Sequence, residues 1–309
     1  MLALALSALG CSSTAGEPSA STPTADPDEL AVAAITWQGG VEEPKLEMAT
    51  PLRVTEPTIG LIERGSGDRI TMGQLVTFDS LVVDGETGEV ESSTFGTETP
   101  ERLIISPNTA NVTMLTAMQS ASVGARFLYV IPDGRTLEDA PIEDATGENA
   151  PVGQPSKVIG ISIRSAESLP AEAAGKAGKP DPALPTVEFA ADGTPELKPM
   201  KGEPGSDLAV AALIEGTGPA VTEGQTLGVK YGMWLWDGTP VGTAWGDLPA
   251  VAFNLDEAIS GWRKAIVGKK VGSRILMVLP PALAYGGAGQ DGIPPDSTLV
   301  VLVDILAAY

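Results

Sequence analysis

The stretch Val271–Pro280, which reads VGSRILMVLP, occurs a second time in the chain as VGARFLYVIP at Val123–Pro132. Six of the ten positions are identical. Shorter landmarks precede both stretches in the same order: Gly65–Gly67 and Gly216–Gly218, Gly73–Gln74 and Gly224–Gln225, and Asp84–Gly85 and Asp237–Gly238. The period is too long for a solenoid, whose repeats span about 20–50 residues. The sequence therefore predicts a duplicated domain.

Both copies are predicted to consist mainly of strands, because their apolar residues are β-branched or alternate with polar ones. The Asp-Gly pairs at 84 and 237 predict hairpin turns. The expected strands are Leu75–Phe78, Arg126–Ile131 and Val158–Ile163 in the first copy, and Leu227–Trp236, Ile275–Leu279 and Leu299–Ile305 in the second. Many strands with few helices predict an α+β fold with antiparallel sheets.

One short helix is predicted over Leu255–Ile266. Asp256 and Glu257 suit its first turn, where acidic side chains complement the helix dipole. Ile259, Trp262 and Ile266 follow helical spacing. Gly261 lowers helix propensity by about 1 kcal/mol relative to alanine, so packing must hold this helix in place.

Composition excludes several classes of function. The chain has 309 residues, a net charge of −21, no histidine and one cysteine. A strongly acidic chain is not a binder of nucleic-acid backbone. Without histidine, Ser-His-Asp and Cys-His catalysis and imidazole metal sites are impossible. A single cysteine excludes intrachain disulfides and thiolate zinc clusters. We therefore predict no metal and no cofactor.

The N-terminus is predicted to carry a targeting signal. Residues 1–11 form a short apolar run that ends at Cys11, similar to the signal peptide and lipobox of a bacterial lipoprotein. An apolar N-terminus with an incidental cysteine is the alternative. Residues 12–30, rich in Ser, Thr, Ala and Pro, are predicted to be a disordered tether. The expected location is the extracytoplasmic face of the cell membrane, with attachment through the lipid.

Beyond the tether, the duplication predicts a degenerate first domain at 31–166, a linker rich in Pro, Ala and Gly at 167–182, and a second domain at 183–309. Half of the 14 aromatic residues lie within residues 231–285 of the second domain: Tyr231, Trp234, Trp236, Trp245, Phe253, Trp262 and Tyr285. They form either an ordinary core or a site that works by shape and apolar contact. Trp262 favours a site, because a sheet around so short a helix need not cover the whole ring.

Residues 216–309 resemble the FK506-binding-protein (FKBP) type of peptidyl-prolyl cis-trans isomerase. The matching stretches are Tyr231–Gly238, Ile259–Trp262, Val271–Arg274, Ala284–Gly286 and Ile293–Val300. The resemblance implies two FKBP-like domains, each an antiparallel half-barrel sheet around a short helix. It also implies an isomerase that needs no cofactor, acts on proline-containing polypeptides, assists the folding of exported proteins and takes macrolide inhibitors.

The resemblance also assigns roles to residues. Trp262 is the floor beneath the prolyl ring, and Tyr231 and Phe253 are walls. The backbone N–H of Ile259 donates to a substrate carbonyl, the hydroxyl of Tyr285 donates to the carbonyl that precedes proline, and Ile293 lies on a covering loop. Three positions depart from the family pattern: Val241 and Val301 replace aromatic walls, and Gly242 replaces an aspartate.

These departures predict a wider and less polar pocket, which Trp245 partly refills. Full family-level activity and an isomerase-like module that only holds peptides both stay open. The first copy is predicted to be inert, because Met114 stands where Trp262 stands in the second. Six carboxylates between Asp133 and Ser156 lack the alternating ligand pattern of an EF-hand, so a solvated acidic loop is favoured over a calcium site.

Overall fold

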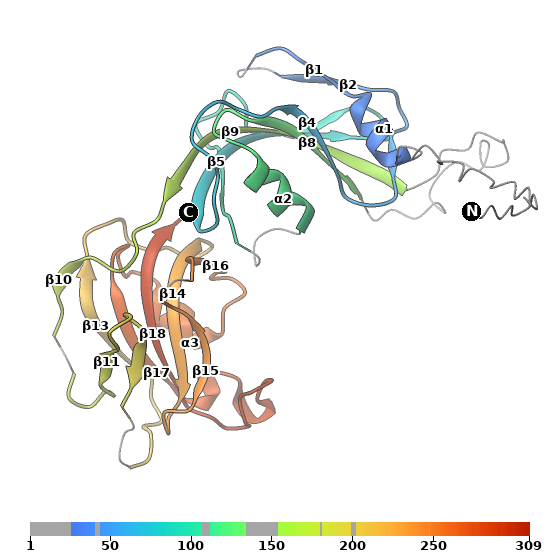
Figure 1. Cartoon of the computed structure of the whole chain (residues 1–309). Coiled ribbons are helices and arrows are strands. Elements are labelled where there is room, and N and C mark those ends of the chain that lie inside the picture. Colours follow the sequence, from blue (N-terminus) through green and yellow to red (C-terminus); the bar gives the residue numbers. More distant parts are fainter. Residues whose placement is uncertain are drawn as a thin grey trace, which may run out of the picture.

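The computed structural model describes residues 26–40, 44–106, 112–133, 154–179, 181–198, 202–246 and 248–309 (Figure 1). Cys11, residues 12–25 and most of the acidic loop after Asp133 lie outside this description. The first half contains α1 (Pro27–Ala33), β1 (Thr36–Gln38), β2 (Lys45–Glu47), β3 (Arg53–Val54), β4 (Thr58–Glu63), β5 (Gln74–Asp84), β6 (Val90–Ser93), β7 (Glu101–Ile104), α2 (Val112–Ser120), β8 (Arg126–Pro132) and β9 (Gln154–Ser168).

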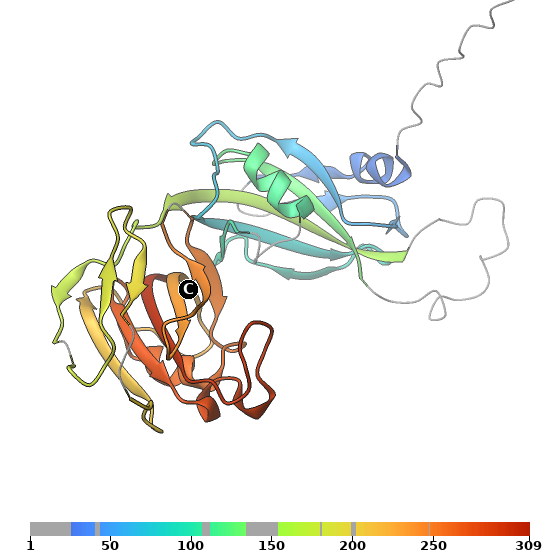
Figure 2. The same cartoon turned by 60° about the horizontal axis from the view of Figure 1, so that its bottom comes forward.

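The second half contains β10 (Gly175–Ala177), β11 (Val187–Phe189), β12 (Pro195–Leu197), β13 (Ala209–Gly216), β14 (Thr226–Leu235), β15 (Pro240–Ala244), β16 (Val251–Asn254), α3 (Ser260–Ile266), β17 (Arg274–Leu279), the 3₁₀ turns η3 (Pro281–Leu283) and η4 (Gly286–Ala288), and β18 (Leu299–Ala308). Each half is built on its own antiparallel sheet, and the two sheets form separate lobes in Figures 1 and 2.

The first sheet has the strand order β4-β8-β9-β5-β6, with β3 beside β9 and β7 beside β5. Successive side chains of a strand point to opposite faces, and both faces of this sheet are covered. Phe127 of β8 packs with Met118 of α2 on one face. Leu128 packs with Val32 of α1 on the other.

The second sheet has the order β10-β13-β17-β18-β14-β15, with β16 beside β14. Helix α3 covers one face, and the β11–β12 hairpin lies on the opposite side (Figure 1). The central strand β18 is buried from Leu299 to Ala307, because neither face of the sheet meets water at this point. The prediction of an α+β fold with antiparallel sheets and few helices is confirmed. The first half differs from the expected single helix, because α1 and α2 cover opposite faces of its sheet.

The predicted helix over Leu255–Ile266 is wrong in its first turn, because α3 begins only at Ser260. The side chain of Asn254 accepts a hydrogen bond from the N–H of Asp256 at 2.9 Å. The N–H of Ala258 then donates to the carbonyl of Leu255. Such local side-chain bonds favour a turn over a helix, so Asp256 and Glu257 lie outside the helix that we expected them to begin.

Two other predictions also need adjustment at their ends. Residues 27–30 of the predicted tether belong to α1, which Asp26 caps by accepting from the N–H of Asp28. Within the predicted linker 167–182, residues 167 and 168 end β9 and Gly175–Ala177 form β10. The expected turns at both Asp-Gly pairs are present, although Gly88 rather than Gly85 takes the positive φ, at 77°.

Candidate functional site

Strand β14 determines which aromatic side chains meet. Tyr231 and Met233 pack on the α3 side of the second sheet, whereas Trp234 and Trp236 pack on the hairpin side. The aromatic cluster that the sequence groups together is therefore divided by the pleat of the sheet. Only Tyr231, Phe253, Trp262 and Tyr285 share the α3 side.

Trp262 is the centre of this group. Phe253 of β16 lies against it, with ring centroids 4.3 Å apart and planes inclined by 37°. The ring of Tyr231 meets it edge-on at 6.2 Å and 81°. Trp262 is only 5% exposed, so its aromatic neighbours cover more of the ring than the short helix suggests.

Four more predicted residues surround the same core. Val241, Val301, Ile259 and Ile293 belong to the cluster around Trp262, and Tyr285 packs against it. They come from β15, β18, the start of α3 and the loop before β18. The structure thus brings together all eight side chains that the resemblance selects in this domain. Cys11, the predicted lipidation residue, lies outside the described residues.

Ile259 presents a backbone donor at the start of α3. As the N-cap residue it has φ −57° and ψ 150°, and its carbonyl accepts from the N–H of Trp262 at 3.1 Å. Its own N–H has no acceptor among the described residues. An N–H of this kind, at the edge of the apolar Trp262 cluster, is suited to bind a carbonyl oxygen.

Burial changes the pKa of one phenol of the cluster, that of Tyr231. Burial raises the pKa of Tyr231 above its ordinary value of 10.0, and the nearby phenol of Tyr285 raises it further. Tyr231 therefore stays a neutral hydrogen-bond donor at physiological pH. The hydroxyls of Tyr231 and Tyr285 and the backbone N–H of Ile259 are polar groups at the edge of the Trp262 cluster.

Gly242 leaves open the space beside Tyr231. A Cβ at this position would lie 3.4 Å from Cε of Met233 and 3.9 Å from the hydroxyl oxygen of Tyr231. An aspartate here would therefore reach that hydroxyl, and the glycine provides no such partner. This agrees with the less polar pocket that the sequence predicts.

Trp245 does not refill the pocket, so that prediction is wrong. It lies on the hairpin side of the sheet, with its ring centroid 6.1 Å from that of Phe189 and 5.3 Å from the guanidinium carbon of Arg274. Trp245 directly follows β15, so the register of β15 decides on which face of the sheet its side chain lies. Sequence alone does not fix that face, because the bulge in the β14–β15 pair shifts the register.

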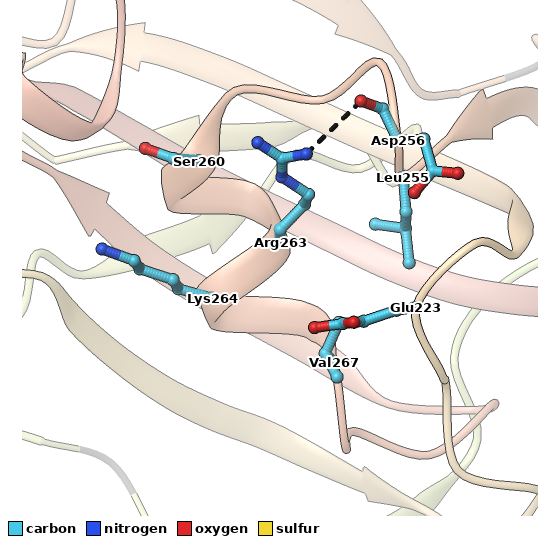
Figure 3. A pocket seen from close by; sticks show the side chains of 7 residues that line it. All are labelled: Glu223, Leu255, Asp256, Ser260, Arg263, Lys264 and Val267. Atoms are coloured by element: carbon cyan, nitrogen blue, oxygen red, sulfur yellow. Dashed lines mark hydrogen bonds between the residues drawn. The ribbon is translucent and has the colours of Figure 1, made fainter.

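The opposite face of α3 borders a hollow that the sequence did not suggest. Ser260, Arg263, Lys264 and Val267 follow helical spacing and line a cavity of about 530 Å³ together with Glu223, Leu255 and Asp256 (Figure 3). The guanidinium of Arg263 donates to the carbonyl of Asp256 at 3.4 Å. This hollow has charges of both signs and shares Leu255 and Val267 with the Trp262 cluster, whereas Trp262 itself lies on the buried face of the helix.

Within the described ranges, no group of three His, Cys, Asp or Glu side chains is placed to hold a metal ion. No helix among the same residues has the length and apolarity that crossing a bilayer requires.

Comparisons with known proteins agree on one family. Residues 218–306 match the model of the "FKBP-type peptidyl-prolyl cis-trans isomerase" family. An "FK506-binding protein" of Streptomyces anulatus is 38% identical over 118 residues, which cover 37% of this chain and 95% of that protein. The FKBP-type isomerase FkpA of Escherichia coli K12 is 41% identical over 99 residues, covering 32% of this chain and 37% of FkpA.

Among solved structures, that of FkpA from Escherichia coli matches with a TM-score of 0.32 and 32% identity, over 40% of this chain and 51% of that one. The matched sequence regions contain the Trp262 cluster and the strands that hold it. The chain therefore belongs to the family of FKBP-type peptidyl-prolyl cis-trans isomerases.

Proposed function

We propose that the Trp262 cluster catalyses cis-trans isomerisation of X–Pro bonds in polypeptides that fold outside the cytoplasm. The observation that carries this proposal is the convergence of eight predicted side chains on one face of the second sheet. An X–Pro bond isomerises over a barrier of about 18–20 kcal/mol, because twisting removes the amide resonance. The reaction breaks no covalent bond and requires neither a metal nor a cofactor.

The proposed mechanism is removal of water from the amide. A planar amide has more charge on its carbonyl oxygen than a twisted one. An apolar site that excludes water therefore favours the twisted form over the planar one. Phe253 and Tyr231, packed on Trp262, provide the apolar walls for the prolyl ring.

Hydrogen bonds then hold the substrate while it twists. We assign the hydroxyl of Tyr285 to the carbonyl of the residue before proline, and the free N–H of Ile259 to a second substrate carbonyl. Ile293, Val241 and Val301 complete the apolar lining. Because one relative bears the name "FK506-binding protein", we propose that macrolides of that type occupy the same pocket.

The test is the cis-to-trans rate of an Ala-Leu-Pro-Phe peptide with the full chain. We expect a rate above the uncatalysed one. In Tyr285→Phe it falls about 2- to 10-fold, since a hydrogen bond contributes about 0.5–1.5 kcal/mol. Tyr129→Phe, the same change in the first half, is the matched control and should leave the rate unchanged. Equal rates for Tyr285→Phe and the parent would contradict the hydrogen bond that we assign to this hydroxyl.

A second candidate function is binding of proline-containing segments without turnover. The empty space at Gly242 favours it, because Tyr231 lacks the partner that an aspartate would supply. Peptide-induced quenching of tryptophan fluorescence together with an uncatalysed isomerisation rate would support this alternative. A catalysed rate would contradict it.

We also propose that a lipid on Cys11 anchors the protein at the extracytoplasmic face of the membrane. The position of the only cysteine directly after an apolar run supports this proposal. Expression of the parent and of Cys11→Ser, followed by detergent phase separation, tests it. The parent should partition into the detergent phase and the variant into the aqueous phase. Aqueous partition of both proteins would argue against the anchor.

A further inference from the structure

The internal repeat shows that a strand covers the outer edge of the second sheet, whereas no strand among the described residues covers the same edge of the first. Strand β10 pairs antiparallel with β13, with Gly175 opposite Gly216, Lys176 opposite Glu215 and Ala177 opposite Ile214. Among the described residues, β4 pairs only with β8 and ends the first sheet.

Strands β4 and β13 are equivalent in detail. Each has a bulge at the same place: β4 between Leu61 and Glu63, and β13 between Ala212 and Ile214. After the bulge, Glu63 faces Arg126 and Ile214 faces Arg274, the two arginines that match in the repeated decapeptide. Gly65 of the first half therefore corresponds to Gly216 of the second.

Glycine contacts show that no described residue of the first half takes the position that β10 has in the second. A Cβ on Gly272 would lie 2.7 Å from the carbonyl oxygen of Ala174, in the segment that leads into β10. The corresponding Gly124 has nothing closer than Cα of Gly65, at 3.9 Å, among the described residues. Beside this position, Leu61 is 44% exposed and Ile62 38%.

Strand β10, which pairs with β13, shows which residues can lie beside an edge of this kind. Cβ atoms on Gly175 and Gly178 would lie 2.0 Å and 1.7 Å from carbonyl oxygens of Glu215 and Ala212, so both positions require glycine. The N–H of Gly178 donates to the carbonyl of Leu213 at 2.9 Å. An occupant of the β4 edge therefore needs two glycines, three positions apart.

Charge specifies the residue after the first glycine. In the second half, Lys176 lies opposite Glu215, a cross-strand pair of opposite charge. The position equivalent to Glu215 is Arg64, which is exposed. Cross-strand pairs of opposite charge stabilise a sheet, and pairs of like charge destabilise it.

We propose that the β4 edge binds an extended segment of a partner protein with the pattern Gly-acidic-small-Gly, added as an antiparallel strand opposite Glu63–Gly65. Strand addition of this kind takes its affinity from main-chain hydrogen bonds and its specificity from side chains. The site is separate from the Trp262 cluster and does not depend on turnover.

The test uses two labelled peptides, acetyl-Ala-Ala-Gly-Glu-Ala-Gly-Ala-amide and its Lys counterpart, with fluorescence anisotropy on the full chain. We expect the Glu peptide to bind about two- to fivefold more tightly, from the energy of one cross-strand charge pair. Arg64→Glu should reverse this order. Arg102→Glu, an exposed arginine on β7, makes the same change of charge elsewhere and should keep it.

A Glu peptide with valine in place of its second glycine should not bind, because the Cβ would overlap a carbonyl oxygen. A photocrosslinker on the Glu peptide should label residues 58–66. Equal binding of the Glu and Lys peptides, binding of the valine peptide or crosslinks elsewhere would overturn the proposal. Self-association of the chain that is lost in Ile62→Lys would also overturn it, because the edge would then take a second copy.

Discussion

Tyr231 combines a structural and a chemical role in one phenol. Burial raises its pKa, and the pKa of Tyr309 is raised for the same reason. In the unfolded chain both phenols ionise near pH 10. The folded state favours the neutral phenols. Their contribution to the free energy of unfolding is therefore fully present below pH 10 and is lost as the pH rises through the higher pKa values of the folded state.

We expect the free energy of unfolding to fall as the pH is raised above 10. Tyr231→Phe and Tyr309→Phe together should make this dependence shallower, because phenylalanine cannot ionise. Urea unfolding at a series of pH values measures the effect. The same slope in the double variant and the parent would show that these phenols do not titrate differently in the two states.

Gly242 allows a test of what limits activity. Asp at 242 would place a carboxylate within reach of the Tyr231 hydroxyl, and Phe at 241 would restore an aromatic wall. We expect Val241→Phe with Gly242→Asp to raise kcat/KM about tenfold or more, since a hydrogen bond to a charged group contributes about 1.5–3 kcal/mol. Gly242→Ala, which adds a Cβ alone, is the control. No change in the double variant would mean that other residues complete the pocket.

At the scale of elements, Gly261 explains how so short a helix is held. A Cβ on Gly261 would lie 2.8 Å from the carbonyl oxygen of Leu283 and 2.9 Å from Cδ2 of Leu279. The helix therefore approaches β17 and the η3 turn more closely than any other residue would allow. Glycine is a poor helix former, and this close packing offsets its unfavourable helix propensity.

We expect Gly261→Ala to lower the free energy of unfolding by about 1–3 kcal/mol, the usual cost of overpacking. Helix propensity alone predicts the opposite sign, a gain of about 1 kcal/mol. Denaturant unfolding of the variant measures the difference, with Gly242→Ala as a control whose Cβ has room. A stabilised Gly261→Ala would show that the helix shifts easily to admit the methyl group.

The elements that sequence could predict are those with a regular pattern. Strands such as β14 and β17 are visible because runs of apolar and β-branched residues are a local property of the chain. The first turn of the predicted helix was wrong because one side-chain bond from Asn254 competes with it. The face of Trp245 was wrong because a bulge between β14 and β15 changes the register. The departures at Val241 and Gly242 could be recognised only against the family pattern. The edge of β4, which has no second strand beside it among the described residues, could be recognised only from the strand pairing of the two halves.

For the whole molecule, the contact between the halves is specific. Cδ1 of Ile104, in the first sheet, lies 2.7 Å from where a Cβ on Gly228 would stand. The N–H of Ile104 donates to the hydroxyl of Tyr309 at 3.2 Å. From the opposite side, Pro249 lies over Gly73, with Cβ of the proline 2.8 Å from the position of an added Cβ. Each half therefore places a side chain on a glycine of the other.

Tyr309→Phe should destabilise this contact. The N–H of Ile104 would lose its phenol acceptor in a buried place, at a cost of about 1–3 kcal/mol. We expect faster amide exchange at Ile104 and neighbouring residues of β7, measured by hydrogen exchange of the full chain. Exchange at Leu279 in β17, far from the contact, serves as the reference. Unchanged exchange at Ile104 would mean that water or another group replaces the phenol.

The segment between the halves also supports the second sheet. The N–H of Ala173 donates to the buried carboxylate of Asp304 at 2.7 Å, and Arg274 donates to the same carboxylate at 2.7 Å. A fragment that begins at residue 183 lacks the first of these donors and the whole of β10. Isolated second halves should therefore begin before Glu172.

Strand β18 is the last strand of its sheet in sequence, yet it lies in the middle, between β17 and β14. The same is true of β9, which lies between β8 and β5. During synthesis, each sheet thus stays divided into two unjoined pieces until its final strand emerges. Until then the strands that will flank β9 and β18 have unpaired edges, and unpaired edges can pair with other chains.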